Sequence, residues 1–264
     1  MRYGVCFGTD DPKKVTAAKA AGFDYIECGF ASFVNDSDER LGTFRRALEE
    51  NGMLNEAANC FIPGELPLLG DGFDPVALRA YVEKGLARGT PLGLKKIAFG
   101  SSYARRIPAG MLYTDAARAL TKAIAEVLAP ACAQYGVTIV IEPLNKLECR
   151  TLNTLREGAL LAAAVNRDNV KLLADLYHME QNGETGEDVR LMKGVLAHGH
   201  ISQPFSNRGM KREFPTDPAA FDYAGFVQAL ADAGVETCSI EAATVDFFAD
   251  VAAAGKVLKS LTIR

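Results

Sequence analysis

The fold of this chain is decided by the stretch Gly136-Val137-Thr138-Ile139-Val140-Ile141-Glu142. Gly136 follows a segment rich in Ala, and glycine tolerates the left-handed conformation that ends many helices. The apolar, β-branched run after it is typical of a strand covered on both faces in a parallel sheet. The stretch therefore predicts a helix that ends at Gly136 and a buried strand that ends in a carboxylate.

The same unit recurs along the whole chain. A residue that tolerates the left-handed conformation separates a helix-like segment from a short apolar run at Gly22, Gly52, Gly93, Gly136, Asn169, Gly194 and Gly234. With an opening strand, the predicted strands are residues 3–7, 23–27, 53–60, 96–100, 137–142, 170–175, 195–201 and 235–241. The predicted helices are residues 12–21, 37–51, 75–88, 114–135, 153–165, 188–196, 221–233 and 245–261.

Strict alternation of strands and helices indicates an α/β fold. A single (β/α)8 TIM barrel spanning residues 1–264 is the economical interpretation, and a doubly wound sheet is the structural alternative. Long segments follow three of the strands, at residues 61–74, 101–113 and 202–220. Loops after the strands build the active face of such barrels, so these segments are expected to surround a substrate site.

Composition excludes several classes of function. The chain has 29 basic and 33 acidic residues and a net charge of -4, which disfavours binding to nucleic acid. No apolar run approaches the ~20 residues that cross a bilayer, and the start does not resemble a signal peptide, so a cytoplasmic protein is expected. The six cysteines are scattered without a C-x-x-C pair, which favours reduced thiols. Hydrolase, zincin, dinucleotide-fold and P-loop signatures are also missing.

Four polar residues stand at the ends of four successive predicted strands. They are Glu142, Asp175, His200 and Glu241. Side chains at one rim of a barrel converge on its axis, and three carboxylates with one imidazole suit a divalent ion such as Mn²⁺, Co²⁺ or Mg²⁺. The summed negative charge of the three ionised carboxylates exceeds the positive charge of a divalent ion, so one of the carboxylates could serve as a base beside the ion.

This donor set favours proton transfer at carbon. An ion that polarises a carbonyl, with a carboxylate over the neighbouring carbon, supports removal of a carbon-bound proton. Two glutamates on opposite sides of one carbon, Glu142 and Glu241, could remove and return the proton from either face. Such a geometry inverts a stereocentre or moves a carbonyl.

The chain also resembles the sugar phosphate isomerase/epimerase family of xylose isomerase-like TIM barrels, which includes ketose 3-epimerases and hydroxypyruvate isomerase. The resemblance extends over essentially the whole chain. It is carried by the segments Ile141-Glu142-Pro143-Leu144-Asn145, Asp175-Leu176-Tyr177-His178-Met179, His198-Gly199-His200 and Ser239-Ile240-Glu241, and by Phe99-Gly100-Ser101-Ser102 with Arg105-Arg106-Ile107-Pro108.

The resemblance implies roles for particular residues. It implies that the metal ligands are Glu142, Asp175, His200 and Glu241, and that Glu142 and Glu241 double as the acid/base pair. It implies further that Glu148, His178 and Arg208 contact the substrate, although the family's arginine lies six residues after the histidine and Arg208 lies eight after it. Zn²⁺ is a further candidate ion for the purified protein, and homodimers or tetramers are common among such barrels.

The expected function is a divalent-metal-dependent isomerase or epimerase of a small ketose or keto-acid, acting through an enediolate. A lyase that dehydrates a keto-polyol such as an inosose or a dehydroshikimate-like acid is an alternative, because the same carbanion can expel a β-hydroxyl. A non-catalytic sugar-binding barrel is another. The endonuclease branch of the superfamily is disfavoured because the chain has only three histidines.

Three other polar residues carry weaker expectations. His198 is expected to face the helix layer and pack in the core, while Glu27 is expected to be a fifth polar group in the substrate cup. Glu56 is a weaker candidate for the same cup.

Overall fold

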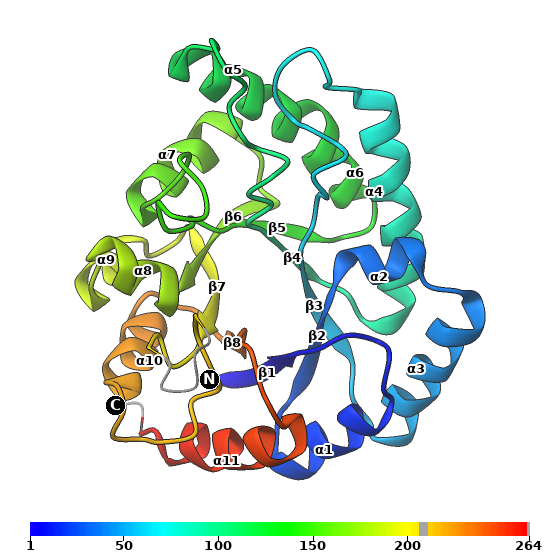
Figure 1. Ribbon diagram of the computed structural model, residues 1–264, viewed down its shortest axis with the longest axis vertical. Helices are drawn as coiled ribbons and strands as arrows, with labels where there is room; N and C mark the ends of the chain where they lie inside the picture. Colours follow the sequence, from blue (N-terminus) through cyan, green and yellow to red (C-terminus); the bar gives the residue numbers. More distant parts are fainter. Residues whose placement is uncertain (206–210, 263–264) are drawn as a thin grey trace.

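Eight parallel strands close into a barrel in chain order, with β8 pairing back onto β1 (Figure 1). The computed structural model describes residues 1–205 and 211–262. The strands are β1 (Arg2–Cys6), β2 (Tyr25–Gly29), β3 (Asn55–Asn59), β4 (Lys96–Phe99), β5 (Thr138–Ile141), β6 (Val170–Asp175), β7 (Leu196–Ile201) and β8 (Thr237–Ile240). The predicted barrel is confirmed, and the doubly wound alternative is wrong because this sheet closes on itself.

Helices surround the barrel (Figure 1). They are α1 (Lys13–Ala21), α2 (Phe30–Asn35), α3 (Asp38–Glu50), α4 (Pro75–Gly89), α5 (Tyr113–Ala123), α6 (Ala129–Gln134), α7 (Leu155–Val165), α8 (Leu176–Asn182), α9 (Gly186–Leu191), α10 (Tyr223–Asp232) and α11 (Phe247–Ser260), with a 3-10 turn η1 (Thr90–Leu92) and a π-helical turn η2 (Ile124–Leu128). The helix predicted at residues 114–135 is the continuous run of α5, η2 and α6. The π-helical turn lies just before Pro130, which has no backbone N–H to donate.

The predicted junctions between helices and strands are largely confirmed. All six predicted glycines have positive φ, including 67° at Gly136. The residue that caps the end of α7 is Asn166, with φ 50°, and it lies three residues before the predicted Asn169. The helix predicted at residues 188–196 lies earlier, as α9. The short helices α2 and α8 follow β2 and β6 without a break and were not predicted, because six or seven largely buried residues show no amphipathic period.

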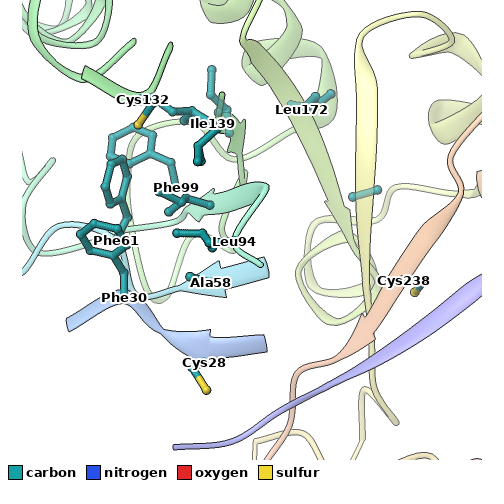
Figure 2. Packing of buried hydrophobic residues seen from close by; sticks show 14 of the residues in the cluster. Cys28, Phe30, Ala58, Phe61, Leu94, Phe99, Cys132, Ile139, Leu172 and Cys238 are labelled. Carbon is teal, nitrogen blue, oxygen red and sulfur yellow. The ribbon is translucent and has the colours of Figure 1, made fainter. Parts of the chain in front are cut away.

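An aromatic cluster fixes the loops on one side of the barrel. Phe30 of α2 packs edge-on against Phe61, which follows β3, at 4.9 Å between ring centroids, and Phe61 packs against Phe99 of β4 at 6.3 Å. Figure 2 shows these three rings beside one another. All three side chains are fully buried, and each such burial is worth about 1.5–3 kcal/mol. The starts of the segments that follow β2, β3 and β4 are therefore held together by these three rings.

In the part of the chain that the structure describes, no helix combines the length and the apolar character needed to span a bilayer.

One carboxyl outside the rim links stability to pH. Glu184 accepts a hydrogen bond from the backbone N–H of Leu155 at the start of α7, at 2.8 Å. Burial raises the pKa of Glu184 to about 7, more than that hydrogen bond lowers it, and the charges of Asp188 and Glu157 raise the pKa further. The folded chain therefore holds a proton that the unfolded chain has released, and stability falls as the pH rises through this window.

The Glu184→Gln variant should lose this pH dependence. Its free energy of unfolding, relative to the wild type, should be higher at pH 8 than at pH 5, as measured by urea unfolding at both values. Glu187→Gln, on the exposed surface of α9, is the matched control, and its free energy of unfolding should change with pH as that of the wild type does. An equal difference between Glu184→Gln and the wild type at both pH values would contradict this account.

Candidate active site

Four side chains meet at the carboxyl-terminal rim of the barrel. Asp175 is the last residue of β6, His200 lies near the end of β7, and Glu142 and Glu241 directly follow β5 and β8. One ligand atom from each lies within 4.8 Å of the ligand atoms of the other three. The four residues singled out from the sequence thus form one cluster, which we call the rim cluster.

The carboxylates of the rim cluster share one imidazole nitrogen. His200 Nδ1 lies 3.2 Å from Glu142 Oε1, 3.2 Å from Glu241 Oε2 and 3.6 Å from Asp175 Oδ2. His200 and Asp175 are almost completely buried and Glu142 is 5% exposed. Nδ1 is therefore the atom of His200 that faces the common centre.

Burial and mutual repulsion shape the charges of this cluster. Burial raises the pKa of Glu142, and the nearby charge of Glu241 raises it further. Burial would also raise the pKa of Glu241, but the positive charges of Arg212 and His200 outweigh it and hold that pKa at about 2. For His200, burial is outweighed by Glu27 and the rim carboxylates, which hold its pKa well above the usual value. The centre attracts positive charge, and three oxygen donors with one imidazole fit a divalent cation.

Arg212 spans two members of the rim cluster and was missed in the sequence. Its guanidinium donates to Asp175 Oδ2 at 2.9 Å and to Glu241 Oε2 at 2.7 Å. The neighbouring Glu213 exchanges two backbone hydrogen bonds with Gln203, which folds the loop after β7 back over the rim. Because the fold-back depends on tertiary pairing, nothing local in the sequence distinguishes Arg212 from the other basic residues of this loop. The predicted Arg208 lies outside the described residues.

A second unpredicted residue holds the other oxygen of Glu241. Asn59, the last residue of β3, donates from Nδ2 to Glu241 Oε1 at 2.9 Å. With Arg212 on Oε2, both oxygens of Glu241 accept hydrogen bonds. Glu142 has a different environment, because its Oε2 lies against Gly100, where an added Cβ would approach it to 2.5 Å.

Glu148 and His178 lie at the edge of the cluster. Glu148 lines a cavity of about 380 Å³ together with Lys211, Arg212 and Glu241, and it accepts from Lys211 Nζ at 3.2 Å. His178 is buried in α8, and its Nδ1 accepts from the backbone N–H of Asn145 at 3.1 Å. Among residues 1–205 and 211–262, no hydrogen bond to His178 Nε2 is found. Within these residues, the ring of His178 is therefore held through Nδ1, which also lies 3.0 Å from Asn145 Nδ2.

The expected orientation of His198 is wrong, although its side chain is buried as expected. Residues two apart on a strand point to the same side, so His198 faces the barrel interior together with His200, and their ring centroids are 5.3 Å apart. Both rings contact Glu27, which is fully buried inside the barrel instead of lining the substrate cup, where it was expected. Glu56 instead pairs with Arg2 at 2.7 Å, at the first residue of β1 and away from the rim.

Comparison with known proteins gives consistent matches. A family model described as xylose isomerase-like TIM barrel matches residues 15–261. D-psicose 3-epimerase from Agrobacterium fabrum is 27% identical over 197 residues, 71% of this chain and 65% of the epimerase. The chain therefore spans slightly less than two thirds of that relative's length. L-ribulose 3-epimerase from Mesorhizobium japonicum is 28% identical over 232 residues, 84% of this chain and 74% of the relative.

Solved structures share the fold. The crystal structure of the IOLI protein with a zinc atom superposes with a TM-score of 0.76, covering 99% of this chain and 98% of the other at 17% identity. At this identity the similarity shows the fold alone.

The space beside Gly100 gives a test of the rim geometry. In the Gly100→Ala variant the new Cβ would force the Glu142 carboxylate away from its place, so uptake of Mn²⁺ should weaken by about 10²-fold. Isothermal titration with Mn²⁺ measures the change. Gly29→Ala is the matched control at the end of β2, because a Cβ there meets only Asn59 Oδ1, at 3.8 Å. Equal Mn²⁺ affinity in both variants would show that Glu142 does not need this position.

Proposed function

The chain belongs to the xylose isomerase-like TIM barrel family, and on that premise we propose that it is a divalent-metal-dependent isomerase or epimerase of a small ketose or keto-acid. The observation that carries the proposal is the rim cluster, in which three carboxylates and one imidazole present their ligand atoms within 4.8 Å of one another. The names of the two curated relatives, both ketose 3-epimerases, support the substrate class.

In this proposal the rim cluster holds one divalent ion. The ligands are Glu142, Asp175, Glu241 and His200 through Nδ1, and the ion is Mn²⁺, Co²⁺ or Mg²⁺, with Zn²⁺ as a further candidate that the zinc-bound IOLI structure supports. When bound, the ion would polarise the substrate carbonyl and the adjacent hydroxyl. It would thereby acidify the hydrogen on the hydroxyl-bearing carbon next to the carbonyl.

Glu241 removes a proton from the substrate carbon and Glu142 adds one to it. They enter the site from β5 and β8, and their environments divide the two roles. Glu241, with hydrogen bonds to both oxygens, is held as a carboxylate and takes the proton from carbon, while the C–H electron pair moves into the enediolate. Glu142, whose pKa burial raises, carries a proton that it returns to carbon from the other side. In the reverse reaction the two residues exchange roles.

Residues around the cavity orient the substrate. Glu148 and Arg212 line the same cavity as Glu241, where they can hydrogen-bond to hydroxyl and carbonyl oxygens. His178 can donate from Nε2, because its Nδ1 is already an acceptor. Arg208, which the family resemblance indicates, is kept as a further proposed substrate contact.

Hydrogen exchange at carbon tests the proposal. The full chain is incubated with a panel of ketoses and keto-acids in deuterium oxide, with and without Mn²⁺, and products are followed by NMR. We expect metal-dependent uptake of deuterium next to the carbonyl of one substrate class. Glu142→Gln and Glu241→Gln should each lower turnover by about 10²- to 10⁴-fold, as expected for loss of a general acid or base. Glu83→Gln, on the outer face of α4, is the control and should retain full turnover.

Other outcomes identify the competing functions. Accumulation of a product that absorbs in the ultraviolet, as an enone does, would replace isomerisation by dehydration. Full turnover in both glutamine variants would exclude the acid/base pair. No exchange on any substrate, with Mn²⁺ bound, would favour a sugar-binding protein.

A further inference from the structure

A buried carboxylate lies inside the barrel directly below the rim cluster. Glu27, in the middle of β2, has no exposed surface, and each of its oxygens faces one imidazole of β7. Oε1 lies 2.9 Å from His200 Nε2, and Oε2 lies 3.1 Å from His198 Nε2. The carboxylate is therefore held between the two histidines.

The hydrogen-bond partners of His198 determine which of its ring nitrogens carries the proton. Lys96 Nζ donates to Thr237 Oγ1 at 2.7 Å, and Thr237 Oγ1 lies 2.9 Å from His198 Nδ1. An ionised Glu27 carboxylate only accepts at Nε2 of His198, so Nδ1 of His198 accepts from the Thr237 hydroxyl. His198 then carries its proton on Nε2 and donates it to Glu27.

The same reasoning sets the proton of His200. An ionised carboxylate only accepts hydrogen bonds, so Glu27 Oε1 requires the proton of His200 on Nε2. A divalent ion at the centre shared by the three rim carboxylates would take the place of the proton on Nδ1, and the Nδ1 lone pair would then be directed at that ion. Histidine ligands of metals in proteins are commonly oriented by a carboxylate on their second nitrogen.

We propose that Glu27 is a positioning residue that fixes the tautomer and the orientation of His200 for the metal ion, with His198 holding Glu27 in place. This inference rests on the proposed function, since it assumes that the rim cluster binds a divalent ion. It adds a residue on β2 to the requirements of that site.

A competing arrangement makes a different prediction. Cys6, Glu27 and His200 also offer ligand atoms within 4.8 Å of one another, which would suit a second ion. His200 Nε2 carries the proton that it donates to Glu27, however, and has no lone pair for a second ion, so we expect one ion per chain. Elemental analysis of the metal-loaded chain distinguishes one ion from two.

The Glu27→Gln variant tests the proposal. An amide offers one oxygen and one NH₂ group, so it cannot accept from both imidazoles at once. We expect its Mn²⁺ affinity, measured by competition with a chelator, to fall by about 10- to 100-fold. The visible absorption of bound Co²⁺ should also change, because it reports the ligand geometry independently of turnover. Glu56→Gln removes a carboxylate that pairs with Arg2, and it should leave both readouts unchanged.

Each outcome has a defined meaning. Wild-type Mn²⁺ affinity and an unchanged Co²⁺ spectrum in Glu27→Gln would overturn the role of Glu27 while leaving the proposed function intact. A wild-type chain that binds no divalent ion would instead refute the proposed metal site. If circular dichroism shows that Glu27→Gln does not fold, His198→Gln replaces it in the test. That variant removes one donor to Glu27, so unchanged affinity would overturn the proposal and a several-fold loss would support it.

Discussion

The repulsion among two buried carboxylates and one partly exposed carboxylate around one imidazole nitrogen is the constraint on which the rest of this structure depends. Glu142, Asp175 and Glu241 are brought together at the rim, where little water can screen their charges. Such a cluster is stable only when positive charge is supplied to it. Arg212 supplies part of it through contacts with Asp175 and Glu241, and His200 faces all three carboxylates. A divalent ion is the ligand that this charge pattern fits.

The closed barrel holds these groups against their repulsion. Their strands, β5 to β8, are consecutive neighbours, so hydrogen bonds between strands fix the separation of the side chains. The barrel interior is divided, with a small apolar group of Ala98, Val140 and Leu173 on β4 to β6. Glu27 and His198 also lie inside the barrel, and Thr237 connects His198 to Lys96 at the first residue of β4. The polar residues inside the barrel therefore contact the rim cluster through His200.

The sequence was sufficient for features that repeat or are local, and insufficient for contacts made across the barrel. Apolar runs after helix-ending glycines located six of the eight strands, and the opening run and the run after Asn169 located β1 and β6. Polar residues at or near the ends of β5 to β8 located the rim cluster. Arg212 and Asn59 could not be identified, since one is returned to the rim by backbone pairing of Glu213 with Gln203 and the other reaches Glu241 from β3. The side of β7 that His198 faces was predicted wrongly, because His198 and His200 are two residues apart and therefore point to the same side. Glu27 was expected near the substrate, but only the structure shows that it contacts both histidines.

The most direct test of this account is anomalous diffraction from crystals of the chain grown with Mn²⁺. The account predicts one strong anomalous peak, bounded by the carboxylates of Glu142, Asp175 and Glu241 and by His200 Nδ1. A peak on the Cys6 side of His200, or no peak at the rim while Arg212 still bridges Asp175 and Glu241, would contradict it.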